Sequence, residues 1–222
     1  MGVRAIITGV TGMVGEGVMH ECLNDPEVEL VTVLTRKSCG ITHPKLREVI
    51  HADFWNIAGL EQELRSHNAC FFCLGVSSVG MSEADYTRIT YDLTLHIAGL
   101  LSEWNPQMVF CYVTGSGTDS TEQGKSMWAR VKGKTENDLL KLPFKQAYMF
   151  RPGYIHPTKG LTQTHKYYFA LSWLYPLLKP IFPNSLITLK QLGKAMIRAA
   201  TTGYVKPIVE ARDILALAAE KR

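Results

Sequence analysis

A glycine-rich segment near the N-terminus constrains the fold of this chain more than any other feature. Gly9, Gly12 and Gly15 stand in the spacing GxxGxxG, directly after the apolar run Val3–Thr8 and at the start of a helical pattern. A side chain at any of these positions would block the turn, the approach of a ligand or the packing of the helix. Because backbone amides at the start of a helix bind phosphate, the spacing predicts a diphosphate-binding loop. The alternative is a tight glycine turn without a ligand.

Four neighbours of the glycines complete the predicted loop. Met13 and Val14 begin the helix, so we expect their backbone amides to face a bound phosphate. Thr8 and Thr11 are expected to add hydroxyl donors.

Short apolar runs alternate with longer helical patterns along the rest of the chain. Such alternation predicts an α/β fold, in which a parallel sheet carries helices on both faces. Six strands complete two mononucleotide-binding halves, so the expected architecture is a doubly wound Rossmann sheet of about six or seven strands. We expect residues 1–222 to form a single domain, with 154–190 as a small lid or appendage that covers the substrate. The strands are expected at Val3–Thr8, Leu30–Thr35, Glu48–His51, Cys70–Gly75, Met108–Thr114 and Gln146–Arg151, and the helices from Met13 to Asn24 and at Ile57–Ser66, Glu83–Glu103, Met127–Lys141 and Leu189–Thr201.

The end of the second predicted strand indicates which dinucleotide binds. About 20 residues after such a loop, a site that prefers NAD usually has Asp or Glu against the ribose hydroxyls. Arg36 and Lys37 stand there instead, and two cations favour the additional phosphate of NADP, which makes NAD the less favoured cofactor. The alternative is that both side chains are merely solvated. After the third strand, Asp53 is either a partner for the adenine amino group or an exposed loop acid.

Composition and charge argue against several partners. Hydrophobic residues make up 46% and charged residues 20% of the chain, as in ordinary globular proteins. The net charge of +4 is spread along the sequence, so we expect no nucleic-acid partner. The histidines lack the spacing of a metal site, and no metal is predicted. The five cysteines fall mostly in apolar segments, which indicates free thiols in a reducing compartment and hence a cytoplasmic location.

For two further groups of polar residues, we favour contact with solvent over a role in catalysis. Glu136 and Asp138, with Lys132 and Lys134, are expected to form a solvated charged face of a helix. His156 is either an acid/base group of a substrate pocket or a loop histidine bonded to solvent, and we favour the second.

A very apolar segment rich in aromatic residues lies at residues 167–183. Pro176, Lys179 and Pro180 interrupt it before it reaches the roughly 20 residues that a membrane-spanning helix needs. Three interpretations stay open: a lid over a small-molecule substrate of apolar character, a surface for peripheral contact with a membrane or a protein, and ordinary packing against the sheet. The oligomeric state is left open.

Five blocks carry a resemblance to a known superfamily. They are TGVTGMVG at Thr8–Gly15, FFCLG at Phe71–Gly75, VTGSG at Val113–Gly117, WARVKGKTE at Trp128–Glu136 and FRPGYI at Phe150–Ile155. In this order they resemble the atypical, extended-type short-chain dehydrogenase/reductase superfamily, especially its small TIP30-like and NmrA-like members. The resemblance implies further contacts of the dinucleotide: Leu74 and Gly75 on the adenine-ribose side, Thr114 and Ser116 beside the nicotinamide, Pro152, Gly153 and Ile155 over its carboxamide, and Lys132 at its ribose.

One departure from the family pattern bears on catalysis. Active members have a tyrosine four residues before the lysine, where it acts as general acid, and this chain has Trp128 there. An indole N–H donates a hydrogen bond but exchanges no proton near neutral pH. A proton must then come from Thr114 or Ser116 through water, from the substrate, or from another tyrosine. The candidate tyrosines are Tyr112, Tyr154 and Tyr168.

Two functions of different classes follow. The first is an NADP(H)-dependent oxidoreductase or epimerase-like enzyme for an unidentified small molecule, with Thr114, Ser116 and Lys132 at the reaction centre. The second is a catalytically silent module that senses NADPH and reports it to a partner. In a third interpretation, the segment 167–183 is a docking surface and the cofactor is purely structural.

Overall fold

A seven-stranded parallel sheet forms the centre of the molecule. The computed structural model describes residues 2–158, 160–161, 163 and 185–220, so the segment 167–183 lies outside the described residues. The strand order is β3-β2-β1-β4-β5-β6-β9, and each neighbouring pair is parallel. Strands are added outward from β1, first on one side and then on the other, which is the doubly wound Rossmann topology. The predicted fold class is therefore confirmed.

The elements alternate along the chain as the sequence predicts. The strands of the main sheet are β1 (Val3–Thr8), β2 (Val28–Thr35), β3 (Leu46–Ile50), β4 (Ala69–Phe72), β5 (Val109–Val113), β6 (Gln146–Arg151) and β9 (Ile208–Glu210). Two short strands, β7 (Tyr154–His156) and β8 (Leu186–Thr188), form a separate parallel pair. The helices are α1 (Met13–Asn24), η1 (Ala58–Leu60), α2 (Glu61–Leu64), α3 (Glu83–Thr87), η2 (Arg88–Asp92), α4 (Leu93–Trp104), α5 (Met127–Leu139), α8 (Leu189–Thr201) and α9 (Ala211–Ala219).

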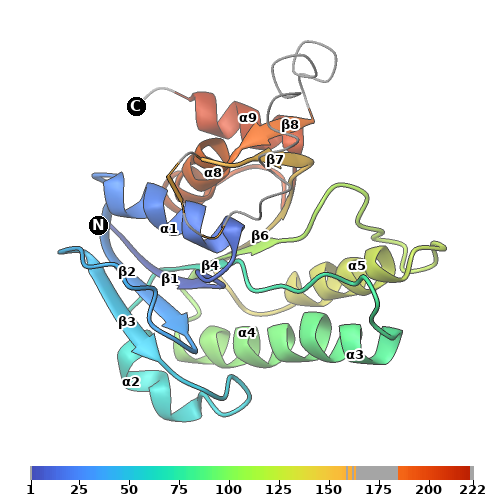
Figure 1. The fold of residues 1–222 in the computed structure, drawn as a ribbon, viewed down its shortest axis with the longest axis horizontal. Coiled ribbons are helices and arrows are strands. Elements are labelled where there is room, and N and C mark those ends of the chain that lie inside the picture. Colours follow the sequence, from blue (N-terminus) through green and yellow to red (C-terminus); the bar gives the residue numbers. More distant parts are fainter. Residues whose placement is uncertain (1, 159, 162, 164–184, 221–222) are drawn as a thin grey trace.

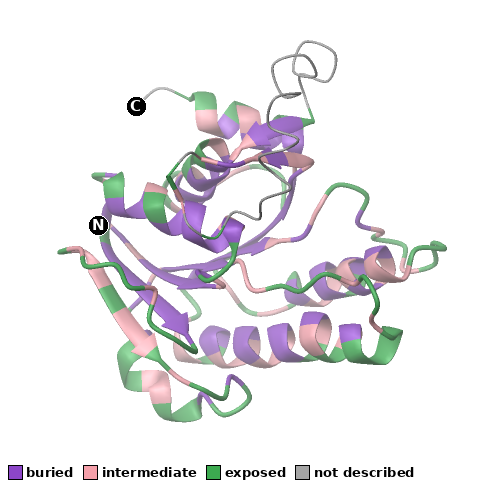
Figure 2. Ribbon diagram, in the orientation of Figure 1, coloured by how far each residue is buried: buried purple, intermediate pink, exposed green. Residues whose placement is uncertain are grey.

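Helices cover both faces of the sheet, and each face has its own apolar core. Helices α1, α8 and α9 lie on one face, and α2 to α5 lie on the other (Figure 1). Successive strand residues point to opposite faces, so Ile7 belongs to the first core and Ile6 to the second. Strands β1, β2 and β4 are accordingly buried along nearly their whole length, whereas the edge strand β3 is partly exposed (Figure 2); burial on both faces is typical of the inner strands of parallel sheets.

The two cysteines of the apparent CxxC pair illustrate this alternation. Cys70 packs in the core beneath α4, whereas Cys73 packs against the core beneath α1. All five cysteines are free thiols in the structure. Three steps along the strand thus place these two thiols on opposite faces of the sheet.

The helix predicted at Glu83–Glu103 is present, and the chain is helical without a break from Glu83 to Trp104. A π-helical turn, η2, lies within it, between α3 and α4. A wider turn of this kind does not change the apolar pattern enough to be visible in the sequence. The strands β7, β8 and β9 were also missed, since each has only three residues, as was α9.

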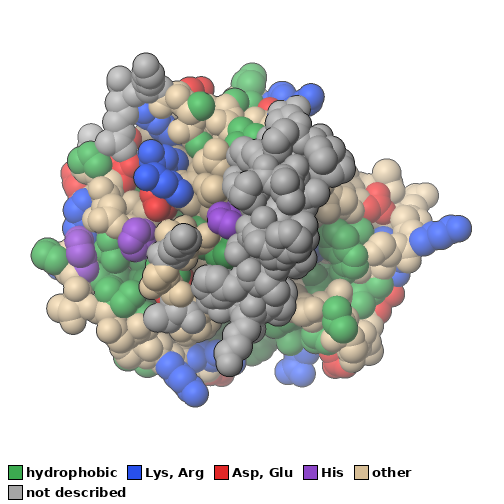
Figure 3. All heavy atoms as spheres, turned by 45° about the horizontal axis from the view of Figure 1, so that its top comes forward, with side chains coloured by type: hydrophobic (Ala, Val, Ile, Leu, Met, Phe, Trp, Pro, Cys, Tyr) green, Lys and Arg blue, Asp and Glu red, His purple; other side chains and the backbone are tan. Residues whose placement is uncertain are grey.

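Along the described part of the chain, every helix is too short or too polar to pass through a bilayer. On the face drawn in Figure 3, the coloured Lys and Arg side chains stand at separate places, several with an acidic side chain beside them.

Candidate functional site

Each of the three glycines in the loop after β1 meets a different structural requirement. Gly9 adopts φ +72°, and a Cβ there would lie 2.6 Å from the carbonyl oxygen of Cys73. A Cβ at Gly15 would overlap with the backbone of Gly9, so Gly15 allows α1 to pack on the loop. Gly12 is the N-cap of α1, and its Cβ would meet only the Gly9 carbonyl oxygen, at 3.4 Å. There is therefore no room for a side chain at Gly9 or Gly15, whereas the start of α1 at Gly12 is open. A phosphate-binding loop requires this arrangement.

Side chains next to the glycines turn away from this opening. Met13 is buried in the core and Val14 packs against it, so these two residues offer their backbone amides rather than their side chains. Thr8 is also buried, and its hydroxyl accepts the backbone N–H of Leu74 at 3.2 Å. The expectation that the Thr8 hydroxyl serves a ligand is therefore wrong, whereas the Thr11 side chain is exposed.

A cleft of about 450 Å³ joins the loop to the end of β2. It brings together five residues that the sequence assigns to the cofactor, and four that sequence reasoning missed. The assigned residues are Gly9, Thr11, Arg36, Lys37 and Leu74, and the missed ones are Val10, Leu34, Thr35 and Phe54. Of the four, Phe54 had a usable signal, because it is the one aromatic residue next to the proposed adenine partner.

The two cations of the cleft stand on a loop whose backbone is firmly held. The Thr35 hydroxyl donates to the carbonyl of Lys37 at 2.7 Å. On β3, the Glu48 carboxylate accepts the Ser38 hydroxyl and the Cys39 N–H, at 2.8 and 2.7 Å, and hydrogen bonds from Cys39 and Ser38 lower the pKa of Glu48. Arg36 and Lys37 themselves are exposed and form no ion pair with any residue in the described ranges.

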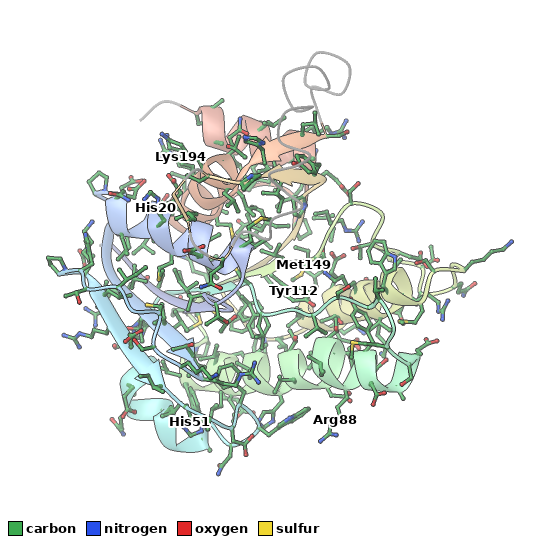
Figure 4. The ribbon with its side chains drawn as sticks, in the orientation of Figure 1. His20, His51, Arg88, Tyr112, Met149 and Lys194 are labelled. Atoms are coloured by element: carbon green, nitrogen blue, oxygen red, sulfur yellow. The ribbon has the colours of Figure 1, made fainter. Side chains whose placement is uncertain are left out.

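The loop after β3 places Asp53 at the rim of this region. Asp53 is exposed and outside the cleft lining, and one of its carboxylate oxygens accepts the Trp55 N–H at 3.0 Å. His51, labelled in Figure 4, is bonded through Nε2 to the carbonyl of Asn56 at 2.8 Å, which closes the same loop. Gly75, next to Leu74, is likewise exposed and outside the cleft lining.

The second half of the site lies at the ends of β5 and β6, beside α5. Trp128, Lys132 and Glu136 are four residues apart, so they form one stripe along α5. The helix lies close to the preceding loop, because a Cβ at Gly133 would overlap with the backbone of Asp119. The indole ring of Trp128 lies against Gly117, whose Cβ would be 3.6 Å from the ring.

Lys132 is held at the end of β5. Its Nζ donates to the carbonyl oxygen of Thr114 at 2.8 Å, and burial lowers the pKa of its ammonium to about 8, against the opposing charge of Glu136. Thr114 is buried, and its hydroxyl donates to Glu136 at 2.5 Å. The Ser116 side chain, by contrast, is exposed and makes no hydrogen bond with a described residue, while its N–H donates to the Pro152 carbonyl at 2.8 Å.

Glu136 does not belong to a solvated face, and that expectation is wrong. Its carboxylate is fully buried and binds Arg151, whose Nε lies 3.1 Å from both of its oxygens. Asp138 does lie on the solvated side of α5, where it pairs with Lys134 at 2.8 Å and Lys141 at 2.6 Å. The charge pattern of a helix alone does not reveal a partner on a distant strand.

The candidate tyrosines differ in their surroundings. Tyr112, labelled in Figure 4, belongs to the core on the α4 side of the sheet, and burial raises the pKa of its phenol far above neutrality. Tyr154 and His156 lie on β7, and Tyr168 lies outside the described residues. Tyr112 therefore holds its proton tightly at neutral pH and is a poor general acid.

The segment after β6 packs closely against the start of β8. A Cβ at Gly153 would overlap with the carbonyl of Ser185, and Ile155 is buried in the core with α8. Further along, the N–H of Gln163 donates to the buried carboxylate of Glu16 in the first turn of α1, at 2.8 Å. This part of the chain thus passes over the start of α1.

Comparisons with known proteins agree with this arrangement. The model of the NAD dependent epimerase/dehydratase family matches residues 5–126. Protein FMP52, mitochondrial, of Candida albicans is 24% identical over 210 residues, which cover 89% of this chain and 87% of that protein. An ADP-L-glycero-D-manno-heptose-6-epimerase of Helicobacter pylori superposes with TM-score 0.69 at 13% identity, over 98% of this chain and 80% of its own. A short chain dehydrogenase of Burkholderia cenocepacia in complex with NADP superposes with TM-score 0.68 at 16% identity. The match covers 99% of this chain and 94% of that one.

The relatives correct one prediction. The sequence was expected to belong to a cytoplasmic protein, but the curated relatives that match are named as mitochondrial proteins. A cytoplasmic location is therefore wrong. Free thiols are compatible with any reducing compartment, so cysteine usage could not distinguish the two.

Proposed function

Because the chain belongs to the NAD dependent epimerase/dehydratase family, we propose that it is an NADP(H)-dependent oxidoreductase or epimerase-like protein acting on an unidentified small molecule. The family match and the similar folds confirm its resemblance to the short-chain dehydrogenase/reductases. The observation that carries the proposal is the cleft in which the glycine loop that leads into α1 and two exposed cations meet. An anion with two separated phosphate groups is complementary to both features.

The residues around the cleft suit a dinucleotide with a 2′-phosphate. The amides at Met13 and Val14 would bind the diphosphate, and Gly12, whose N–H donates to the Gly9 carbonyl at 2.9 Å, would let it come close. Arg36 and Lys37 would bind the 2′-phosphate. Leu74 and Phe54 supply an apolar wall for the adenine, with Asp53 and Gly75 at its rim. An acid that would repel the phosphate is absent from the described lining of the cleft.

On the opposite side, this chain's own groups orient the reacting atoms. The bound nicotinamide supplies or accepts hydride. We assign Lys132 to the hydroxyl groups of the adjoining ribose and the Ser116 hydroxyl to a carbonyl or hydroxyl of the substrate. Thr114 acts through its carbonyl, which fixes Lys132, because its hydroxyl is directed to Glu136. Pro152, Gly153 and Ile155 would close the pocket over the carboxamide.

A direct titration tests the proposal. Purified protein is titrated with NADPH and NADH by calorimetry, and we expect NADPH to bind about tenfold to a hundredfold more tightly, as one or two charge-assisted hydrogen bonds would provide. The 2′-phosphate alone is tested by comparing 2′,5′-ADP with 5′-ADP. Equal affinities within each pair would remove the assignment of NADP, and failure of all four ligands to bind would remove the proposal.

A second function is favoured by Trp128, namely a silent module that senses NADPH. The indole at the acid's position has no proton to exchange, so the chain can hold a cofactor without turning it over. Oxidation of bound NADPH by a panel of aldehydes, ketones and quinones supports the enzyme. If wild-type protein is inactive but Trp128→Tyr reduces members of the panel, the site is assembled and lacks only its acid, which favours the sensor.

We also propose a mitochondrial location, which rests on the names of the relatives. Fractionation of cells that express the chain with a C-terminal tag tests it. Recovery of the tagged protein outside the mitochondrial fraction would contradict it.

A further inference from the structure

A buried carboxylate lies directly behind the proposed reaction centre, and the proposed function does not use it. Glu136 has no exposed surface, yet it accepts the Thr114 hydroxyl at 2.5 Å and two donors of Arg151. Arg151 in turn donates to the Ser120 hydroxyl at 2.5 Å and to Glu210 at 3.3 Å. A charged network of this kind is costly to bury, so its place next to the site calls for a reason.

The network reaches Lys132 through one residue. Thr114 donates its N–H to the Phe150 carbonyl and its hydroxyl to Glu136, while its own carbonyl oxygen accepts from the Lys132 ammonium. The carbonyl that orients Lys132 is thus fixed at the other end of the same residue. We infer that Glu136 is a positioning residue, which acts through Thr114 to keep the Lys132 ammonium charged and directed at the cofactor.

The other charged groups around α5 are engaged elsewhere. From α3, Glu83 pairs with Arg130 at 2.8 Å. From η2, the Tyr91 hydroxyl donates to Asp138, and its ring lies beneath the Lys134 ammonium at 4.7 Å.

Arg130, Lys134 and Asp138 each follow a residue of the stripe that carries Lys132 by two positions. They therefore lie on the opposite side of the helix. From β6 and β9, Arg151 and Glu210 stand behind Glu136. His96 of α4 lies against Trp55. Tyr112 of β5 faces the same side of the sheet as α5, and burial raises the pKa of its phenol, to which the charge of Glu136 adds, so it stays uncharged. Glu136 is thus the charge that acts on Lys132.

The carboxylate has a definite effect on the lysine. Burial lowers the pKa of the Lys132 ammonium to about 8, and the negative charge of Glu136 opposes that decrease. Without the carboxylate, we expect the ammonium to lose its proton nearer to neutral pH. A neutral amine gives weaker hydrogen bonds to the ribose hydroxyls than an ammonium does. Glu136 therefore sets the upper pH limit at which the lysine can serve the cofactor.

The first experiment needs no cofactor. The pKa of Lys132 is read in the free protein from the pH dependence of its side-chain NMR signal, assigned with Lys132→Arg. We expect Glu136→Gln to lower the midpoint by roughly one pH unit or more, the size of shift that a nearby opposite charge causes. Asp138→Asn, which removes a carboxylate from the other side of α5, should leave it unchanged. An unmoved midpoint in Glu136→Gln, or an equal change in Asp138→Asn, overturns the inference.

A second variant guards against loss of folding. Glu136→Gln leaves Arg151 without its partner, so the double variant Glu136→Gln with Arg151→Met removes both charges of the pair. It is expected to fold and still to lower the midpoint, because the charge of Glu136 opposes the decrease in the Lys132 pKa. A midpoint equal to that of the wild type in this variant also overturns the inference.

The second experiment measures NADPH affinity between pH 6.5 and 10, and this part rests on the proposed function. Affinity should fall roughly tenfold as Lys132 deprotonates, which the 2′-phosphate cannot cause, because it titrates near pH 6. Glu136→Gln should move this fall to lower pH, and Lys132→Arg should abolish it. Thr114→Val should weaken binding at pH 7, and Thr114→Ser should restore it. Binding of NADPH with a pH profile that ignores these variants contradicts the inference alone, whereas absence of binding contradicts the proposed function.

Discussion

The two halves of the candidate site treat their polar groups in opposite ways. At the ends of β1 and β2, Arg36, Lys37 and Thr11 are exposed around a cleft, and the two cations form no ion pair with a described residue. At the ends of β5 and β6, Lys132 and Thr114 are already bonded to other groups of the protein. The exposed cations of the first half are complementary to an anion, whereas the polar groups of the second half are fixed by hydrogen bonds within the protein.

This difference separates binding from chemistry. The departure from the family pattern, Trp128, lies in the second half, whereas the first half keeps the glycines and the two cations on which the proposed phosphate contacts depend. Binding of the dinucleotide can therefore persist whether or not the chain catalyses a reaction. Variants of the buried network in the second half should accordingly change stability and the protonation of Lys132, and through it the pH dependence of affinity. Variants of the exposed residues in the first half should change affinity directly.

The largest effect is expected from Arg151→Met in the second half. The substitution leaves the Glu136 carboxylate buried without its partner, which costs about 3–5 kcal/mol in the free energy of unfolding. Urea denaturation followed by circular dichroism measures this loss. Arg36→Met is the matched control, because the same replacement at an exposed cation should change stability by less than about 0.5 kcal/mol. Similar losses in the two variants would show that the pair contributes little to the fold.

Next in size is the contrast between two glycines of the first half. A Cβ at Gly15 overlaps with the backbone of Gly9, so Gly15→Ala should destabilise the protein by about 1–3 kcal/mol through displacement of the loop. Gly12→Ala meets the Gly9 carbonyl oxygen at only 3.4 Å and should retain stability while it weakens NADPH binding. Thermal unfolding and calorimetry measure the two quantities. If Gly12→Ala binds NADPH normally, no phosphate approaches the start of α1.

Arg36→Ala comes third, and its effect is confined to affinity. Loss of one charge-assisted hydrogen bond of about 1.5–3 kcal/mol should weaken NADPH binding by roughly tenfold to a hundredfold. NADH lacks the 2′-phosphate and should bind as it does to the wild type. Parallel titrations with the two dinucleotides measure both. An equal loss for both would mean that Arg36 contacts the adenine and not the phosphate.

The sequence predicts the first half much better than the second. The glycine spacing and the basic end of β2 are local signals, and the fold brings Gly9, Arg36 and Leu74 together because parallel strands end at one edge. Strands β1 and β6 and helix α8 also match their predicted bounds, since long apolar periodicity determines them.

The second half depends on contacts between residues far apart in the chain. The pair formed by Glu136 and Arg151 is invisible to helical periodicity, which places Glu136 with its neighbours on a charged face. The direction of the Thr114 hydroxyl is likewise decided by the buried carboxylate and not by the sequence block that contains it. Strand β9 was missed because three residues carry no periodicity, although its Glu210 joins the same network.

The smallest expected effect tests the rim of the first half, at Asp53. One carboxylate oxygen accepts the Trp55 N–H, and the other is the one that we assign to the adenine amino group. Asp53→Asn keeps an acceptor for Trp55 but replaces the second oxygen by a donor. Loss of one hydrogen bond of about 0.5–1.5 kcal/mol should weaken NADPH binding by roughly threefold to tenfold. The matched ligand is the hypoxanthine analogue of NADPH, which has no amino group and should bind the variant as well as it binds the wild type. If both ligands lose affinity equally, Asp53 only closes its own loop, and the recognition of adenine is left to the apolar wall formed by Phe54 and Leu74.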